Sequence, residues 1–191
     1  MIANPLSGQR VRLTAMRAED VPTLASWQAD GEFLRLLDAV VAHPRGEAQL
    51  VEWLAEAPKR SDGYLFAIRP LDDERLIGYI EFDGILWNQG VGSFSVAIGD
   101  PADRGQGYGT EALELALRFA FNELNLHRLE ITVFSYNQRA IAVYERLGFR
   151  HEGTHREFVL RDGQRHDMLL YGLLRREWEL RDECRVPSAE E

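Results

Sequence analysis

Three glycines at alternate positions stand between a predicted strand and a predicted helix. They are Gly105, Gly107 and Gly109, within residues 96–110. Glycine lets the main chain adopt unusual φ angles and lets a ligand approach it closely. The start of a helix adds unpaired N–H groups and the positive end of the helix dipole, and Arg104 adds a positive charge. This pattern predicts a cradle for a phosphate or pyrophosphate; the alternative is a glycine-rich turn that only starts a helix.

The spacing of these residues excludes two common nucleotide motifs. A P-loop requires Gly-Lys followed by Ser or Thr, which is absent here. The dinucleotide fingerprint Gly-x-Gly-x-x-Gly does not fit glycines at 105, 107 and 109. The anion therefore belongs to another kind of ligand.

A second segment, residues 137–149, places polar and small side chains at helical spacing. On a helix, Asn137, Ala140 and Tyr144 lie at i, i+3 and i+7 and share one face. An amide, a small residue and a phenol would then line one side of a groove. The alternative is that Asn137 is an ordinary N-cap and Tyr144 an ordinary packed aromatic residue.

Both segments carry a family resemblance. Arg104-x-x-Gly107-x-Gly109 resembles the Arg/Gln-x-x-Gly-x-Gly signature of the GNAT superfamily of acetyl-CoA-dependent N-acetyltransferases, and residues 137–149 resemble its second signature, Asn-x-x-Ala-x-x-x-Tyr-x-x-x-Gly-Phe. The opening strand, the helix after Asp20 and the closing pattern up to Glu177-Trp178 are similar to the RimJ/RimL-type branch, which acetylates protein N-terminal amines. Residues 119–127 are also similar to the spermidine acetyltransferases.

The resemblance implies a reaction in which an amine attacks the thioester of acetyl-CoA directly, within a ternary complex. It implies that Tyr144 protonates the departing thiolate, which suits a phenol with an ordinary pKa near 10. Asn137, with Ala140 beside it, would contact the pantetheine arm. The implied cofactor-binding residues are Val96, Ala97 and Ile98, which would pair with the pantetheine, and Arg104, Gly105, Gln106, Gly107, Tyr108, Gly109 and Thr110, which would hold the pyrophosphate.

The group that accepts the amine proton is left open. Many relatives carry a Glu on the strand before the pyrophosphate loop, where this chain has Ser93. Glu81 and Glu130 remain as strand candidates, but neither is assigned a catalytic role. Trp87 and residues 30–44 border the acceptor groove in the family.

The segment His151-Glu152-Gly153-Thr154-His155 matches the zinc motif His-Glu-x-x-His. That motif needs both histidines on one helical turn. Gly148 and Gly153 bracket a stretch without helical period, and an extended chain would hold the two α-carbons about 13 Å apart. No metal is expected.

The elements around these motifs alternate between strands and helices. We predict strands at 10–14, 64–69, 76–82, 92–99, 128–134, 156–160 and 167–173. We predict helices at 20–29, 47–57 and 138–147, and a helix with an apolar face from Leu113 to Leu124; residues 31–45 are expected to be irregular. This order predicts an α/β (α+β) domain with a mixed central sheet of about seven strands and helices on both faces, which the resemblance identifies as the GNAT fold. Residues 1–180 are one domain, and residues 181–191 a frayed tail.

Composition narrows the partners and the compartment. The chain has 191 residues, of which 45% are hydrophobic and 28% charged, with a net charge of −9. A negative field disfavours nucleic acid and attracts amines. No apolar run reaches the roughly 20 residues of a membrane span, no signal peptide is evident, and the single cysteine, Cys184, cannot form an internal disulfide. A cytoplasmic enzyme is expected.

Several functions stay open within this interpretation. A protein or peptide N-terminal amine is the first choice of acceptor, and a polyamine or other small amine the second. A non-catalytic acyl-CoA-binding module is the alternative from another class, although binding alone has no use for a phenol beside the sulfur. A homodimer is common in the family.

Overall fold

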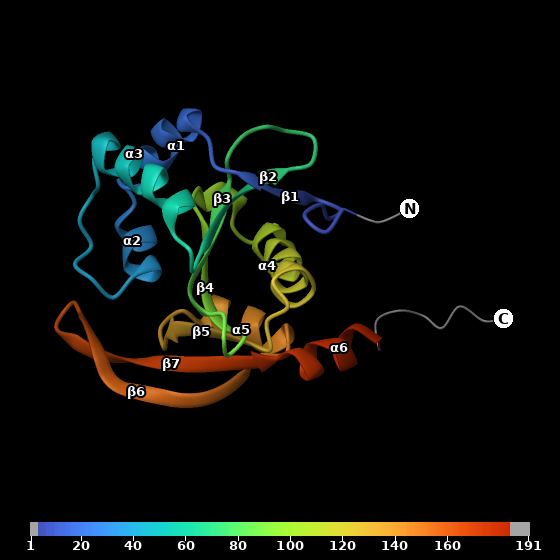
Figure 1. Ribbon diagram of the computed structural model, residues 1–191. Helices are drawn as coiled ribbons and strands as arrows, with labels where there is room; N and C mark the ends of the chain where they lie inside the picture. The colour runs from blue at the N-terminus through green and yellow to red at the C-terminus, as the bar shows by residue number, and fades with distance from the viewer. Residues whose placement is uncertain (1–3, 184–191) are drawn as a thin grey trace.

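The computed structural model describes residues 4–183, and its centre is one seven-stranded mixed sheet (Figure 1). The strand order is β1-β2-β3-β4-β5-β7-β6. The pair β4–β5 is parallel and every other neighbouring pair is antiparallel. The strands are β1 (Val11–Ala15), β2 (Tyr64–Pro70), β3 (Gly78–Leu86), β4 (Val91–Ile98), β5 (Arg128–Phe134), β6 (Arg150–Arg161) and β7 (Gln164–Leu174). The predicted fold class is confirmed.

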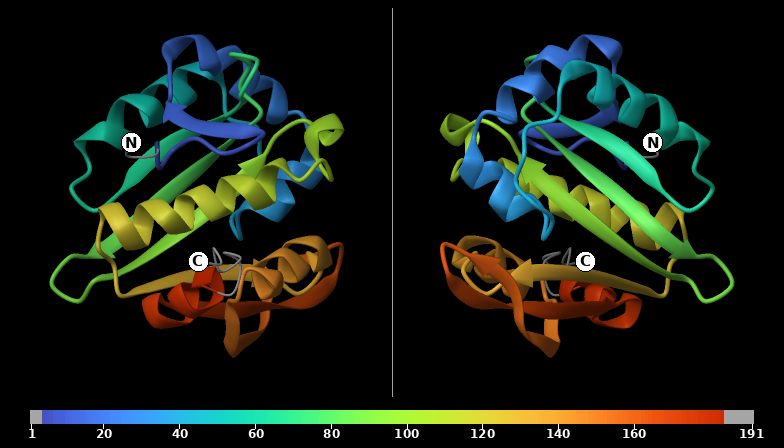
Figure 2. Two further views of the ribbon diagram at one scale, coloured as in Figure 1. Left: turned by 90° about the vertical axis from the view of Figure 1, so that its right-hand side faces the viewer. Right: turned by 90° about the vertical axis from the view of Figure 1, so that its left-hand side faces the viewer.

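Helices cover both faces of this sheet, and each face has its own hydrophobic core (Figure 2). The helices α1 (Val21–Trp27), α2 (Gly31–Leu37) and α3 (Glu47–Glu56) pack through Leu24, Phe33 and Leu50 on one face. The helices α4 (Tyr108–Arg118), α5 (Gln138–Arg146) and α6 (Arg175–Glu183) contribute to the larger core on the other face. Strand side chains alternate between the two faces, so residues an odd number of positions apart pack in opposite cores: Ala97 joins the first core, and Phe94, three positions earlier, joins the second.

The sheet divides between β4 and β5. These strands pair only where Val91–Ser93 meets Arg128–Glu130. Beyond that point β4 continues to Ile98 and β5 to Phe134 without pairing to each other, while their outer edges pair with β3 and β7. The facing main-chain edges of 94–98 and 131–134 are therefore left without a strand partner.

The prediction that residues 31–45 are irregular is wrong for the first half of that range. Helix α2 begins there because the Asp30 carboxylate accepts hydrogen bonds from the main-chain N–H groups of Glu32 and Phe33, at 2.9 and 3.1 Å. The Phe33 ring then packs against Trp27, with ring centroids 5.9 Å apart. An N-cap and an apolar anchor are sufficient for a two-turn helix in this context.

Other elements differ from the prediction mainly in length. Strand β3 continues past a bulge after Asp83, where Gly84 adopts a φ of 57°. Strand β6 begins at Arg150, so the segment 151–155 is extended rather than helical. Helix α6 continues to Glu183, so the first residues of the predicted tail 181–191 are helical. Cys184 and the rest of that tail lie outside the described residues.

Candidate active site

The glycine-rich loop leads from the end of β4 into α4. Gly105 and Gly107 adopt left-handed φ angles of 79° and 85°, a region that favours glycine. These angles turn the chain so that α4 begins at Tyr108. No described residue accepts a hydrogen bond from the main-chain N–H groups of residues 105–110. The loop therefore presents a run of free donors at a helix start, which is an arrangement suited to an anion.

Two arginine side chains hold this loop in place through hydrogen bonds. The Arg104 guanidinium donates to the Asp30 carboxylate at 2.9 Å and to the carbonyls of Gly99 and Ile98 at 2.7 and 3.3 Å. Arg10 donates to the Gln106 carbonyl at 2.9 Å. The side chain of Arg104 thus links the loop to the start of α2. The residues that follow it, 105–110, carry the free main-chain N–H groups.

A cavity of about 530 Å³ lies between the separated parts of β4 and β5. It reaches from the glycine-rich loop and α5 on one face of the sheet to α2 on the other. It brings together residues from both predicted segments. Of the predicted site residues, all except Gln106 and Tyr108 line it, namely Val96, Ala97, Ile98, Arg104, Gly105, Gly107, Gly109, Thr110, Asn137, Ala140 and Tyr144.

Asn137 begins helix α5 at the edge of the cavity. Its Oδ1 accepts a hydrogen bond from the main-chain N–H of Ala140 at 3.2 Å, so it is an N-cap. Its side-chain NH₂ group donates to no described residue. Asn137 can therefore be an N-cap and also contact a ligand, since its amide oxygen is an acceptor and its NH₂ group is a donor.

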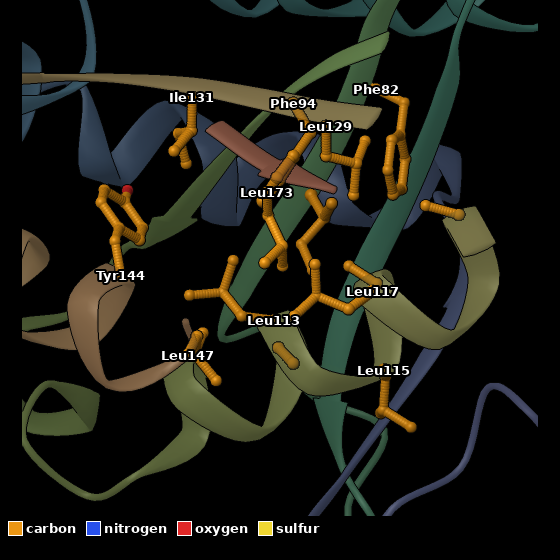
Figure 3. Packing of buried hydrophobic residues seen from close by; sticks show 14 of the residues in the cluster. Phe82, Phe94, Leu113, Leu115, Leu117, Leu129, Ile131, Tyr144, Leu147 and Leu173 are labelled. Carbon is orange, nitrogen blue, oxygen red and sulfur yellow. The ribbon is translucent and has the colours of Figure 1, made fainter. Parts of the chain in front are cut away.

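Tyr144 lies two helical turns further along α5, and its ring is directed away from the helix on the same side as Ile131 (Figure 3). The residue is only 6% exposed, between the rings of Phe149 and Tyr171, with centroids 6.1 and 6.5 Å away. Its hydroxyl makes no hydrogen bond to a described residue. Burial raises the pKa of the Tyr144 phenol above its usual value of 10, because the charged form loses its hydration. The phenol is thus protonated throughout the physiological range.

Two arginines of α5 also line the cavity and were not among the predicted site residues. Arg139 and Arg146 are seven residues apart on α5, which places them on one face. Arg146 donates to the Thr110 hydroxyl at 2.9 Å and so joins α5 to the first turn of α4. That seven-residue spacing within the second signature is the signal that could have identified them.

Helix α2 forms the opposite end of the cavity, through Phe33, Leu36 and Leu37. This helix is tied to the hairpin of β6 and β7, because Arg35 forms a bidentate ion pair with Asp162 at 2.8 and 2.9 Å. That pair lowers the pKa of the Asp162 carboxyl, chiefly through the hydrogen bond from Arg35. Part of residues 30–44, the segment that the resemblance predicts beside the acceptor, therefore borders the cavity.

The cavity lining does not include Glu81, Glu130, Trp87, Ser93 or the two histidines of the zinc motif. The Trp87 indole donates to the Ser61 carbonyl at 2.8 Å and does not line the cavity. Ser93 donates to Asp83. His151 and His155 stand on β6 opposite Tyr171 and Met168, and no three His, Cys, Asp or Glu residues among the described ones are grouped for a metal.

Comparison with known proteins identifies the family. The model of the acetyltransferase (GNAT) domain matches residues 10–150. The chain belongs to the GNAT acetyltransferase family. It is an acetyl-CoA-dependent N-acetyltransferase. The site fits acetyl-CoA, a long thioester with a diphosphate, because it combines the free N–H donors at 105–110 with unpaired strand edges and a cavity between those edges.

Three relatives illustrate the range of this family. The acetyltransferase is 30% identical over 174 residues to the SPbeta prophage-derived N-acetyltransferase YokL of Bacillus subtilis, covering 91% of this chain and 95% of that one. It is 26% identical over 183 residues to the ribosomal protein uS5-alanine N-acetyltransferase of Escherichia coli, covering 91% and 92%. The structure of spermidine N-acetyltransferase from Vibrio cholerae with CoA and spermine shares the fold, with a TM-score of 0.80 at 21% identity over 88% of this chain and 98% of that one. Within residues 4–183, no helix has the length and apolar character of a membrane span.

Proposed function

We propose that this acetyltransferase transfers the acetyl group of acetyl-CoA to the N-terminal amine of a protein or peptide, by direct attack of the amine while both substrates are bound. The proposed branch is the RimJ/RimL type. Acetyl-CoA supplies an activated acetyl thioester. The chain itself supplies the binding surfaces, the orientation of the two substrates and the proton transfers.

The donor would be held by main-chain groups along its whole length. The N–H groups of residues 105–110 would bind the pyrophosphate, with Arg146 adding positive charge at the first turn of α4. The free edge of β4 at Val96–Ile98 would pair with the pantetheine amides. The Asn137 side-chain amide would donate to the same arm.

Tyr144 would serve as the acid. Its ring is fixed by Phe149 and Tyr171, and its hydroxyl has no hydrogen-bond partner among the described residues. A neutral phenol in this position can donate its proton to a leaving thiolate. This role also favours an enzyme over an acyl-CoA-binding module, since binding alone needs no proton donor.

The lining of the cavity is the observation that favours an N-terminal amine over a polyamine. A polyamine carries further cations, which need carboxylates nearby when they leave water. Asp103 is the one carboxylate among the described residues that line the cavity, and both of its oxygens accept hydrogen bonds from Arg75 at 2.7 Å. The α2 end offers Phe33, Leu36 and Leu37 instead, which suit a small uncharged side chain beside the reacting amine.

A relative points the same way. The Escherichia coli protein named above acts, by its name, on an alanine of ribosomal protein uS5, and it matches along 91% of this chain. A spermidine N(1)-acetyltransferase of Vibrio cholerae is also a sequence relative, at 30% identity over 95 residues, but that match covers 50% of this chain.

The test is a thiol-release assay with acetyl-CoA and a matched panel of acceptors. The panel contains a peptide that begins with alanine, the same peptide with a blocked N-terminus and an internal lysine, and spermidine. We expect turnover of the free peptide alone, with mass spectrometry placing the acetyl group on its α-amine. Preferential turnover of spermidine or of the blocked peptide would overturn the acceptor assignment.

A further inference from the structure

The reaction requires a group that accepts the proton of the acceptor amine. An α-amine has a pKa of about 7.7–8.0 and is largely protonated at neutral pH. Ser93 has no carboxylate, and its hydroxyl donates to Asp83. The group that accepts the proton must therefore be another residue of the sheet.

Glu81 stands on β3 directly opposite Ser95 of β4. Side chains opposite each other in an antiparallel pair lie on the same face, with Cβ atoms about 4.5–5.5 Å apart. Ser95 lines the cavity at the point where β4 and β5 have separated. Glu81 does not itself line the cavity, but it stands beside a residue that does.

Glu81 lies on the face of the sheet where the amine substrate would bind. Residues two positions apart on a strand share a face, so Glu81 is on the side of Tyr79, which belongs to the first core together with Ala97 and Phe33 of α2. Helix α2 also lines the cavity. The amine and Glu81 would thus meet on the same side of the sheet.

The surroundings of Glu81 suit proton transfer. Its side chain is 21% exposed, and Arg60 donates to it at 2.8 Å. Burial raises the pKa of the Glu81 carboxyl, the nearby Asp83 adds to that effect, and the positive charges of Arg60 and Arg45 oppose it. A carboxylate whose pKa is moved toward that of the amine is a better base at neutral pH than an ordinary one.

Glu130, the other carboxylate considered on a strand, is also paired with an arginine but differs from Glu81 in exposure and in its strand neighbour. Its side chain is 51% exposed, and it is held by Arg128 at 2.9 Å. Like Glu81 it does not itself line the cavity, but its neighbour on β4 is Ser93, which is not part of the lining, whereas the neighbour of Glu81 is Ser95, which is. Glu130 is therefore a matched control.

We propose that Glu81 is the proton acceptor of the reaction, acting through a water molecule beside Ser95. This inference rests on the proposed acetyl transfer to an amine. Glu81 takes the ammonium proton through the water, which leaves a lone pair on the amine nitrogen. That lone pair forms the N–C bond, the C–S electron pair stays with sulfur, and Tyr144 donates its proton to the sulfur. The second N–H proton leaves the nitrogen for solvent. Glu81 then releases the proton it accepted to solvent, and Tyr144 takes up one proton from solvent, so both groups return to their starting states.

The first experiment compares Glu81→Gln with Glu130→Gln, using the best acceptor found in the panel. We expect Glu81→Gln to lower kcat by about 100-fold or more, a typical contribution of general-base catalysis, with Glu81→Asp intermediate. Glu130→Gln should stay near the wild-type rate. Calorimetric titration with CoA should give the same affinity for all variants, which confirms that the fold and the donor site are intact.

The second experiment uses pH. A catalytic carboxylate is active when deprotonated, so activity is lost as the pH falls through its pKa. Arg60→Gln removes a cation that lowers the pKa of Glu81, so the acid limb of kcat should move to higher pH. The substrate amine is the same for every variant, so a limb caused by the amine would not move.

The outcomes separate the two proposals. If the wild type acetylates no α-amine, the proposed acceptor is wrong, and the role of Glu81 is tested with whichever amine is turned over. If the wild type is active while Glu81→Gln keeps its rate and Arg60→Gln leaves the acid limb in place, Glu81 is not the proton acceptor.

Discussion

Replacing Tyr144 by phenylalanine separates catalysis from stability. The ring would keep its packing against Phe149 and Tyr171, at 6.1 and 6.5 Å between centroids. The hydroxyl has no hydrogen-bond partner among the described residues, so its removal breaks no internal bond. We expect the free energy of unfolding to change by less than about 0.5 kcal/mol, below the roughly 1 kcal/mol of a typical hydrogen bond.

The catalytic effect should be much larger. Removing a general acid lowers a rate by about 10²–10⁴-fold, which corresponds to roughly 3–5 kcal/mol of barrier at 1.36 kcal/mol per tenfold. We therefore expect kcat for Tyr144→Phe to fall by about 100-fold or more, in a thiol-release assay with one peptide acceptor. Calorimetry should give an unchanged affinity for CoA.

Tyr171→Phe is the matched control. The Tyr171 hydroxyl donates to Glu145 at 2.9 Å and does not line the cavity. This variant should lose about 1 kcal/mol of stability and retain its kcat. A Tyr144→Phe enzyme with normal kcat, or a Tyr171→Phe enzyme that loses activity without losing stability, would refute the assignment of the acid.

Three further substitutions test the loop and the packing around it. Gly107→Ala places a side chain at a φ of 85°, at a penalty of about 1–2 kcal/mol, so calorimetry should show CoA affinity weakened by roughly 5- to 30-fold. Gly99→Ala would bring a Cβ within 1.9 Å of the Trp27 indole; overpacking of about 2 kcal/mol should lower Tm by roughly 4–8 °C in calorimetric scans. Asp20→Asn removes the charge that pairs with buried Arg69 at 2.6 Å, and urea denaturation should show a loss of about 3 kcal/mol.

Controls for these substitutions come from exposed positions of the same chain. Gly31→Ala meets nothing within 4 Å and lies in helix α2, so it should leave CoA affinity and Tm close to wild type. Glu56→Gln breaks the exposed pair with Lys59, and a surface pair contributes about 0–1 kcal/mol. Comparable losses in these controls would contradict the structural reasons given for Gly107, Gly99 and Asp20.

Local patterns were sufficient to predict most of the elements. The strand predicted at 128–134 has the bounds of β5, because alternating apolar residues follow the pleat. The helix predicted at 138–147 ends one residue earlier, where Gly148 adopts a φ of 92°. The residues that determine where these two elements begin and end therefore lie within or next to the elements themselves.

Features that depend on distant residues were not predictable from such patterns. Helix α2 is not of this kind, because its N-cap Asp30 and the contact between Phe33 and Trp27 are local and its apolar pattern is only too short to stand out. Arg104 was expected to present its charge to the anion, but its side chain is held by Asp30, a residue far away in the sequence. Leu36 and Leu37 reach the cavity only because the sheet opens between β4 and β5.

The central claim is that the free N–H groups of the glycine-rich loop bind the diphosphate of CoA. Titration of the ¹⁵N-labelled protein with CoA, followed by ¹H–¹⁵N correlation spectra, tests it directly, because glycine amides are well resolved. We predict large shifts for Gly105, Gly107 and Gly109, with Gly84 and Gly163 unmoved. Binding of CoA that leaves the three loop glycines unchanged would contradict the account.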